Sequence, residues 1–499
     1  MRKRSIGAAL ATLAASLVAL GTISQPGEAA ASAGAGEQAL AADNVRGSLN
    51  YLIGRYGVSE AEALRRLELQ RISPALSERL AKEEPDSYAG MWIDQDNGGK
   101  LVVAMTKPER LAAIADTFPD AGNIRAKQVT RSLKELNAIR DDLVARLGRP
   151  GPESLVLPTV REDLNQVVLL RRDWLPAAKA VAGKAAADTM VSDAVRAHGS
   201  AVVSRQLPRP TPAESVSSER AQATPPYADW GYCHPLHCSG YGPMRGGLRL
   251  DIQRDNGTWG GCTAGFNLTS TGGSWPNWRW VLTAGHCVMG SNHTHKDFSY
   301  HNGAIVGEEY GGPLQNNNYP YDYAVMPYDD GDVAKRWINN WSGKNRVLST
   351  CRTGAYDNVS GAKCQRTGDF YMSGYYPEYE IRPGWIVCAS GSGSSKADYG
   401  SAYDTGAGAG YYPGTRCGKV LTVGGGIDTD ICARRGDSGG PLFSELDSKA
   451  YGILAGTYPD QQRTGPCKAG ERNNYSPLSL IFQQLDNYYY DEWFQLNVS

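Results

Sequence analysis

The distribution of cysteines constrains this chain more than any other feature. All ten cysteines lie between Cys233 and Cys467, and the residues before Cys233 contain none. Disulfides persist in oxidising compartments, so an even number of cysteines confined to one half of an exported chain predicts about five bridges in that half. The chain has 499 residues, which exceeds one average domain. We therefore expect two regions, one stabilised by disulfides and one without them.

The N-terminus has the pattern of an export signal. Basic residues 2–4 precede an apolar run over residues 6–23, and the small residues 29–31 offer a cleavage site. The alternative is a membrane anchor, because this run could almost span a bilayer. The small residues favour cleavage, and no later segment is long and apolar enough to span. We expect residues 1–31 to be removed as a signal peptide and the mature protein to be secreted and extracellular, away from membranes.

The region before the cysteines carries signals of both helices and strands. Ser59 and Ser132 each precede a glutamate by three residues, which fits the capping box that opens a helix. Residues 91–105 read as a hairpin around an Asp-Asn-Gly-Gly turn, and a further helical stretch is expected from Arg161 to about Val203. No catalytic grouping is evident here, so residues 35–204 are predicted to form a non-catalytic α/β region.

A proline-rich stretch marks the boundary between the two regions. Residues 205–227 contain five prolines among small polar residues, which is typical of a linker and of a site of proteolysis. Beyond it, short β-branched and aromatic runs are bounded by Gly, Asn or Asp, which predicts a barrel or sandwich of strands. Residues 476–485 predict a final helix. Residues 228–499 are therefore expected to form a mainly β domain.

Three short motifs in the β-rich region combine the residue types of nucleophilic catalysis. Ser438 lies in the sequence GDSGGP, His286 in LTAGHC and Asp322 in DYAV. A serine hydroxyl is a weak nucleophile near neutral pH, so it needs a base to take its proton, and the base needs an acceptor that holds its tautomer. The alternative for GDSGGP alone is a surface turn, because Gly, Asp, Ser and Pro all favour turns.

These motifs, in this chain order, resemble those of the chymotrypsin family of serine endopeptidases. The likeness is closer to the bacterial branch that contains streptogrisins and alpha-lytic endopeptidase, because Cys432 lies six residues before Ser438. The resemblance implies a chymotrypsin-like double β-barrel with a C-terminal helix, preceded by an α/β pro-region. In this branch the pro-region assists folding and inhibits the protease until it is cleaved. The protein is expected to be a monomer whose partners are a polypeptide substrate and its own pro-region.

The resemblance also assigns roles to individual residues. Ser438 would be the nucleophile, His286 the general base and then acid, and Asp322 the carboxylate that orients the histidine. The backbone N–H groups of Gly436 and Ser438 would form the oxyanion hole. Family pairings and proximity suggest five disulfides, although sequence alone does not fix connectivity: Cys262–Cys287, Cys388–Cys417, Cys432–Cys467, Cys351–Cys364 and Cys233–Cys238.

No metal or cofactor is expected. The sequence CHPLHC, which ends at Cys238, contains two cysteines and two histidines and could be read as a zinc site, but a disulfide loop is favoured in an oxidising compartment. His293, His295 and His301 are interpreted as surface-loop residues. A net charge of −1 gives no electrostatic reason to expect nucleic acid as a partner.

The specificity pocket is predicted from four residues. Asp430 lies where trypsin-like relatives carry the aspartate that pairs with substrate Lys or Arg, although a solvated turn residue is the alternative. Ala455 falls where the family has a serine that touches the triad aspartate, Gly456 follows it, and Thr457 replaces a pocket glycine.

The aspartate of GDSGGP, Asp437, raises a separate question about its charge partner. Asp437 is expected to pair with a buried cation, but the position after Cys388, where relatives of this branch have an arginine, is Ala389. The candidate substitutes are Arg352, Arg434 and Arg435, and the sequence does not choose among them.

Two functions from different classes remain open at this stage. The first is a secreted serine endopeptidase made as a proenzyme, with a possible preference for Lys or Arg before the cleaved bond. The second is an inactive homologue that uses the same fold as a secreted binding module. The complete set of triad residues favours the first, and Ala455 favours the second.

Overall fold

The structure is a computed structural model in which residues Leu40–Ser499 form one compact unit. The described residues are 42–176, 183–212, 215–217, 237, 242–253, 259–289, 298–328, 337, 345–350, 367–393, 414–460, 470–488 and 492–498. The expected signal peptide lies outside them. Below, the described residues 42–212 are called the N-terminal half, and those from Ser215 onward the C-terminal half.

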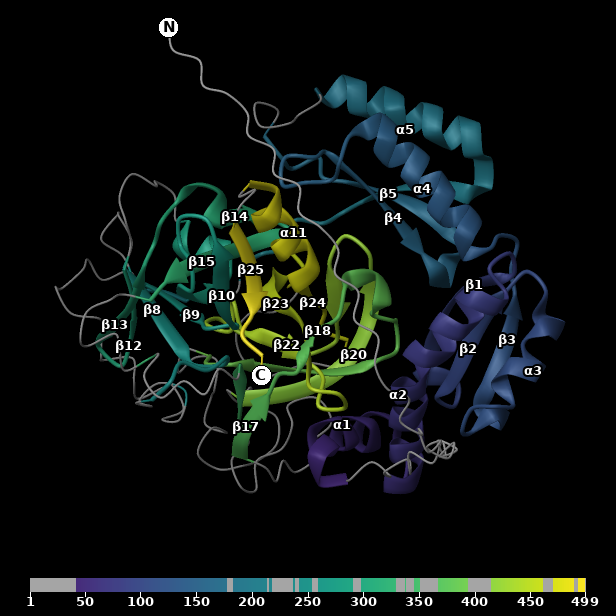
Figure 1. Ribbon diagram of the computed structural model, residues 1–499, viewed down its shortest axis with the longest axis horizontal. Helices are drawn as coiled ribbons and strands as arrows, with labels where there is room; N and C mark the ends of the chain where they lie inside the picture. The colour runs from purple at the N-terminus through teal and green to yellow at the C-terminus, as the bar shows by residue number, and fades with distance from the viewer. Residues whose placement is uncertain are drawn as a thin grey trace, which may run out of the picture. The chain divides into compact units, whose positions relative to one another are not determined.

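The N-terminal half contains two sheets with the same topology (Figure 1). In each, an antiparallel hairpin is followed by a helical segment and by a third strand that pairs in parallel with the second. The first sheet consists of β1 (Tyr88–Asp94), β2 (Lys100–Met105) and β3 (Ile124–Gln128), and the second of β4 (Val156–Arg161), β5 (Gln166–Arg171) and β6 (Val202–Gln206). The principal helices are α1 (Arg46–Tyr56), α2 (Glu60–Glu83), α3 (Ala112–Ala115), α4 (Leu133–Leu147) and α5 (Lys184–His198).

Local sequence signals in this half have mixed outcomes. The predicted hairpin over 91–105 is confirmed by β1 and β2, and the capping box at Ser132 forms in full. The helix expected from Arg161 to Val203 is wrong over its first part. There, the apolar run of β5 is buried between neighbouring strands, and such runs suit a sheet as well as a helix.

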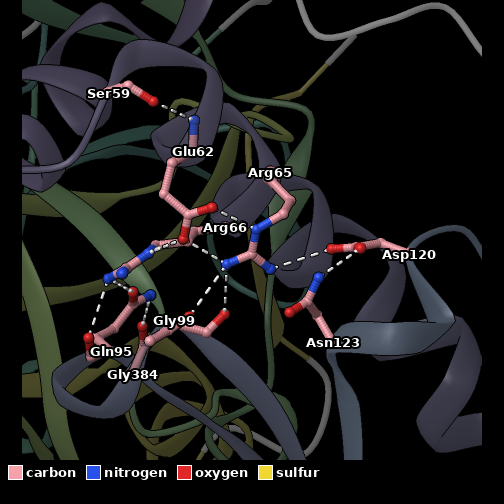
Figure 2. Close-up of polar contacts among 10 residues, drawn as sticks. Ser59, Glu62, Arg65, Arg66, Gln95, Gly99, Asp120, Asn123 and Gly384 are labelled. Carbon is pink, nitrogen blue, oxygen red and sulfur yellow. Dashed lines mark hydrogen bonds and ion pairs between the residues drawn. The ribbon is translucent and has the colours of Figure 1, made fainter.

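The start of α2 is held by a charged cluster around Glu62 (Figure 2). Ser59 Oγ accepts a hydrogen bond from Glu62 N at 3.2 Å, which caps the helix. The Glu62 carboxylate accepts from Arg65 Nε at 2.6 Å and from Arg66 Nε at 2.8 Å, and these guanidinium groups hold the pKa of Glu62 at about 2. Gln95 links this cluster to the C-terminal half, because its side-chain amide donates a hydrogen bond to the carbonyl of Gly384 at 2.9 Å.

Glu62→Gln is expected to remove a pH-dependent part of the stability. Because the folded pKa is about 2 against an ordinary value of 4.5, the charge stabilises the fold above pH 4.5, and this contribution is lost as the pH falls toward 2. The effect at pH 7 should be about 1–2 kcal/mol, because the site is partly open to solvent. Urea unfolding of the full chain between pH 2 and 7 measures it. Glu83→Gln is the control, because Glu83 pairs with Arg79 on the exposed face of the same helix.

The C-terminal half contains the predicted strand-rich domain (Figure 1). Two five-stranded sheets share one core: β13-β12-β8-β9-β7 and β14-β15-β11-β10-β25. Their strands are β7 (Ser215–Ser217), β8 (Arg249–Gln253), β9 (Trp259–Thr263), β10 (Asn267–Gly272), β11 (Arg279–Thr283), β12 (Phe298–His301), β13 (Ala304–Glu308), β14 (Gln315–Asn318), β15 (Tyr321–Pro327) and β25 (Glu492–Leu496).

A second set of strands closes on itself. The order β18-β23-β22-β19-β20-β21-β24 has an additional pairing between β23 and β24, so six of these strands form a closed barrel, which leaves no free edge among them. They are β18 (Gly374–Tyr375), β19 (Ile386–Gly391), β20 (Gly414–Val423), β21 (Ile427–Thr429), β22 (Pro441–Phe443), β23 (Lys449–Thr457) and β24 (Asn473–Pro477), and β16 (Arg346–Thr350) pairs separately with β17 (Thr367–Tyr371).

A final helix completes the domain. Helix α11 (Leu478–Tyr488) follows β24 directly, and its apolar residues Leu478, Ile481 and Leu485 are fully buried. The prediction of a mainly β domain with a C-terminal helix, preceded by an α/β region, is confirmed. Among the described residues, no helix is both long and apolar enough to cross a membrane.

The two halves share buried surface. Leu49 and Leu52 of α1 belong to the same apolar cluster as Ile386 and Cys417 of the closed barrel. Gln70 of α2 exchanges hydrogen bonds with the backbone of Ile386, accepting from its N–H at 2.7 Å and donating to its carbonyl at 3.1 Å. The N-terminal half therefore packs onto the strands that carry one side of the site described below.

Candidate active site

Strand pairing brings the three motif residues together from distant parts of the chain. His286 lies in the short helix α7 (Gly285–Val288), directly after β11, and Asp322 is the second residue of β15. Strands β11 and β15 are antiparallel neighbours, so the end of one lies beside the start of the other. Ser438 lies in the loop between β21 and β22 of the closed barrel. The site is thus formed where the two sets of strands meet.

The histidine bridges the other two side chains. His286 Nε2 lies 2.8 Å from Ser438 Oγ, and His286 Nδ1 lies 2.6 Å from Asp322 Oδ2. Asp322 Oδ1 also accepts the backbone N–H of His286 at 2.9 Å, so the carboxylate holds both the ring and its backbone. Since an ionised carboxylate can only accept, the neutral ring carries its proton on Nδ1, and Nε2 is left to accept from the serine hydroxyl.

Burial keeps this arrangement away from bulk water. Ser438 is fully buried, and the exposed fractions of Asp322 and His286 are 4% and 8%. The backbone N–H of Asp322 donates to Ser476 Oγ at 3.2 Å, a contact for which no sequence motif gave a signal. Ala455 is buried as well and offers no hydroxyl, and both oxygens of the Asp322 carboxylate bond to His286.

The loop before Ser438 presents two backbone donors. Gly436 has φ +95°, a conformation that favours glycine, and its carbonyl is held by Thr263 Oγ1 at 2.6 Å and by Ser392 Oγ at 3.1 Å. Gly436 and Ser438 are buried, yet among the described residues their N–H groups have no hydrogen-bond acceptor. Buried donors of this kind are rare, and two of them beside a hydroxyl can donate hydrogen bonds to a developing oxyanion.

The cation beside Asp437 is Arg416, which the sequence-based candidates did not include. Arg416 Nη2 donates to Asp437 Oδ2 at 3.0 Å, and both residues are almost fully buried. Arg416 on β20 is the register partner of Ala389 on β19. The arginine expected at the position of Ala389 is therefore supplied from the neighbouring strand.

Of the three candidates named from the sequence, only Arg434 and Arg435 lie among the described residues. The Arg434 guanidinium binds Glu471 through two bonds of 2.7 Å, and the backbone N–H of Arg434 donates to Asp437 at 2.9 Å. Arg435 is exposed, and Arg352 lies outside the described residues. The sequence did not point to Arg416 as the partner of Asp437, because a salt bridge across paired strands cannot be located without their register.

Two of the suggested disulfides are present at bonding distance. The sulfurs of Cys262 and Cys287 are 2.04 Å apart, and those of Cys388 and Cys417 are 1.96 Å apart. Cys432 is disulfide-bonded, while its suggested partner Cys467 lies outside the described residues. The pairs Cys233–Cys238 and Cys351–Cys364 also lie outside them.

Metal-ligand groupings in the described residues coincide with these disulfides. Cys262, His286 and Cys287 form one group, and Cys388, Cys417 and Glu445 form the other. Their sulfurs are bonded to each other and cannot act as thiolate ligands.

Two further histidines, His237 and His301, each lie within hydrogen-bond distance of a backbone carbonyl. The Nδ1 atom of His237 lies 2.6 Å from the carbonyl of Gly247. His301 is fully buried, with Nδ1 2.7 Å from the carbonyl of Arg249, so its assignment to a surface loop is wrong. His293 and His295 lie outside the described residues.

Asp430, the suggested pocket floor, faces the N-terminal half. Its Oδ2 accepts from Tyr51 Oη of α1 at 2.5 Å, and its Oδ1 accepts from the backbone N–H of Lys419 at 2.6 Å. Burial raises the pKa of Asp430. Recognition of a basic substrate residue by Asp430 stays a prediction, but its carboxylate oxygens already have partners.

Thr457, which is predicted to form part of the pocket wall, lies beside a residue of a second strand. Thr457 on β23 pairs with Asn473 on β24, and both side chains are 1% exposed. Thr457 Oγ1 and Asn473 Oδ1 have no hydrogen-bond partner among the described residues. Asn473 lies in no recognisable motif, and only the strand pairing brings it to Thr457.

Comparison with known proteins finds one family match and several similar chains. A family model described as Trypsin matches residues 252–470. Serine protease 2 of Streptomyces fradiae is 26% identical over 213 residues, which cover 42% of this chain and 91% of that protein. Among solved structures, protease A of Thermobifida fusca is 19% identical with a TM-score of 0.30, covering 52% of this chain and all of that one. The Nocardiopsis protease is 20% identical with a TM-score of 0.30, covering 51% and 99%.

The family match spans His286, Asp322 and Ser438 together with Gly436. Residues 252–470 are therefore a trypsin-family domain, and the chain is a serine endopeptidase.

Proposed function

We propose that this chain is a secreted proenzyme whose C-terminal half hydrolyses peptide bonds through an acyl-enzyme, using His286, Asp322 and Ser438. The observation that carries the proposal is the pair of contacts made by His286. One ring nitrogen lies 2.8 Å from Ser438 Oγ, and the other lies 2.6 Å from Asp322 Oδ2. A serine, a base and an orienting carboxylate within hydrogen-bond distance of one another are what nucleophilic catalysis requires.

The contacts suggest a role for each residue. His286 Nε2 takes the proton of Ser438 as Oγ attacks the substrate carbonyl, and Asp322 stabilises the imidazolium that results. The oxyanion is held by the N–H groups of Gly436 and Ser438. Losing one such donor typically costs about 2.7–4 kcal/mol of transition-state stabilisation. His286 then protonates the leaving amine, and water releases the acyl group by the same steps in reverse.

Covalent labelling tests this proposal directly. A fluorophosphonate reacts with an activated serine, so the active protein should gain one label on Ser438, located by peptide mass spectrometry. His286→Ala should abolish labelling, because the hydroxyl then has no base. His301→Ala is the matched control, because His301 lies on β12 and its Nδ1 atom contacts the carbonyl of Arg249. Absence of label on the folded wild-type protein would favour the inactive binding module instead.

Substrate preference is the second part of the proposal. If Asp430 recognises Lys or Arg, chromogenic peptides with a basic residue before the cleaved bond should be hydrolysed fastest by the protease freed of its N-terminal half. Because Asp430 is bonded to Tyr51, this preference requires that α1 has left. Equal or faster hydrolysis of peptides with a small apolar residue at that position would contradict the assignment of Asp430 to the specificity pocket.

The proenzyme role rests on contacts between the halves. Glu445 of the C-terminal half accepts the N–H of Ser48 at 2.8 Å near the start of α1. Arg172, which is fully buried, donates to the carbonyl of Tyr319 at 3.1 Å, three residues before Asp322. A folding assistant must bind its protease over such a surface, and a β-rich domain with many long-range contacts folds slowly enough to need one.

Tyr51→Phe is expected to weaken this association. The substitution deletes the hydroxyl that donates to Asp430 and leaves a buried carboxylate oxygen without that donor. The cost should be about 1–3 kcal/mol of unfolding free energy. Urea unfolding of the full chain in a Ser438→Ala background measures it without self-digestion. Tyr379→Phe is the control, because Tyr379 is 71% exposed; equal effects would mean that the Asp430 contact contributes nothing.

A further inference from the structure

Two hydroxyl groups from different sheets hold the backbone carbonyl of Gly436. Thr263, the last residue of β9, donates to this carbonyl from Oγ1 at 2.6 Å. Ser392, which directly follows β19, lies against the same oxygen with its Oγ at 3.1 Å. Both residues are fully buried. Below, the hydroxyls of Thr263 and Ser392 are called the hydroxyl clamp.

The clamp is itself oriented by hydrogen bonds. Thr263 Oγ1 accepts the backbone N–H of Ser392 at 3.0 Å and lies 2.9 Å from Ser392 Oγ. A hydroxyl has one proton, and a lone pair of Thr263 Oγ1 is already used to accept. The proton of Thr263 is therefore directed at the carbonyl of Gly436, where the distance of 2.6 Å is short for a hydroxyl donor.

Thr263 also holds the other end of the same loop. Its backbone N–H donates to the carbonyl of Ser438 at 2.8 Å, so this one residue contacts the chain on both sides of Asp437. The carbonyl of Asp437 accepts the N–H of Gly440 at 2.8 Å. The three carbonyls from Gly436 to Ser438 are thus all bonded, while the N–H groups at the two ends have no acceptor within the described part of the chain.

Gly436 needs such support more than an ordinary residue does. Its φ of +95° lies in a region that glycine enters easily, and a residue without Cβ has the widest choice of backbone conformations. A backbone donor stabilises a developing oxyanion only when it already points at that charge. The freedom of Gly436 therefore has to be restricted before the substrate arrives.

We infer that Thr263 and Ser392 are positioning residues of the proposed oxyanion hole, because their hydroxyls hold Gly436 so that its N–H and that of Ser438 point at the substrate oxygen. The inference rests on the proposed function. Neither hydroxyl is required to touch the substrate. Removing one should weaken binding of the transition state while leaving binding of the substrate itself almost the same.

Thr263→Val tests the stronger contact, because valine removes the hydroxyl and keeps nearly the same shape. The variant is made in the full secreted chain, and rates of the active protein are expressed per serine labelled by fluorophosphonate, so that unfolded molecules do not count. We expect kcat to fall about tenfold with KM unchanged, less than the loss on removing an oxyanion donor itself. Thr263→Ser keeps the hydroxyl and should restore the wild-type kcat.

A peptide boronic acid provides a readout that a purely structural role would not change. It bonds to Ser438 Oγ and forms a tetrahedral adduct, in which one oxygen takes the place of the oxyanion. Its inhibition constant should rise about tenfold in Thr263→Val, in step with the loss of kcat/KM. The inhibition constant of the cleaved product peptide, which has no oxyanion, should stay the same.

Ser392→Ala is the second variant, and it decides the question if Thr263→Val does not fold. Its effects should be of the same kind but smaller, because Ser392 Oγ is farther from the carbonyl and also lies 3.3 Å from the carbonyl of Cys262. Where both variants fold, their combined loss of kcat should be less than the product of the single losses, because both hydroxyls hold one carbonyl.

Thr269→Val is the matched control. Thr269 on β10 is also buried, and its Oγ1 accepts a hydrogen bond from Arg279 at 2.9 Å. This variant should keep the wild-type kcat and the wild-type inhibition constant for the boronic acid, whatever its effect on stability.

The outcomes separate the inference from the proposed function. If the wild type is labelled on Ser438 but the clamp variants keep its kcat, or lose kcat without weaker binding of the boronic acid, the inference is overturned alone. Equal losses in Thr263→Ser and Thr263→Val would overturn it as well. A folded wild-type protein that takes no label overturns the proposed function, and the inference falls with it.

Discussion

Replacing Ser438 by alanine is expected to lower kcat for peptide hydrolysis by about 10⁶-fold, the loss seen when the nucleophile of such a triad is removed. The reason is geometric. Ser438 Oγ lies 2.8 Å from His286 Nε2, the nitrogen that accepts its proton. Alanine leaves the base with no hydroxyl to deprotonate, while backbone donors still bind the substrate, so KM should change little.

Initial rates on a chromogenic peptide series measure this loss. The fold should be retained, because the hydroxyl fills little space and the loop is held by backbone contacts at Gly439 and Gly440. Ser373→Ala, on the exposed surface, is the control and should keep full activity. Residual activity above about one per cent of the wild type, with contamination excluded by active-site titration, would contradict the assignment of the nucleophile.

Arg416→Met is expected to have the largest effect on stability. It removes the cation next to Asp437 and leaves that carboxylate buried without its charge partner, which typically costs about 3–5 kcal/mol. Asp437 also accepts the N–H groups of Arg434 and Gly393, so its displacement would shift the loop that carries Gly436 and Ser438. The activity should therefore fall together with the stability.

A double-mutant cycle separates this pair from its neighbours. Arg416→Met and Asp437→Asn should be strongly non-additive in urea unfolding, because each removes the same interaction. Arg434→Met combined with Asp437→Asn should be closer to additive, since the Arg434 side chain binds Glu471. Arg435→Met should change stability by less than about 0.5 kcal/mol, because that side chain is exposed. Additivity for the Arg416 pair would mean that another group neutralises Asp437.

Residues with local signals could be located from the sequence. The capping box at Ser132, the hairpin over 91–105 and the final helix all depend on neighbours within a few positions, and each is found where it was expected. His286, Asp322 and Ser438 were also identifiable, because each lies in a short motif that combines a reactive side chain with a strand end or a tight turn.

Residues that act across strands could not be located in this way. Arg416 reaches Asp437 only because β20 pairs with β19 in a register that places it opposite Ala389. Ser476 and Asn473 approach Asp322 and Thr457 only because β24 closes the barrel against β23. Register is set by burial and turn geometry over the whole sheet, and a short stretch of sequence does not contain it.

The sequence by itself determined the division into two halves, the mainly β class of the second, and the three residues proposed to react, because composition and short motifs act locally. Only the tertiary structure decided that Asp430 bonds to Tyr51, that Arg416 neutralises Asp437, and that Thr211 and Ser215 pair with Thr457 and Gly261. These four contacts join residues that lie 21 to 379 positions apart in the chain. Long-range contacts of this kind form only when the core has packed and the strand registers are set.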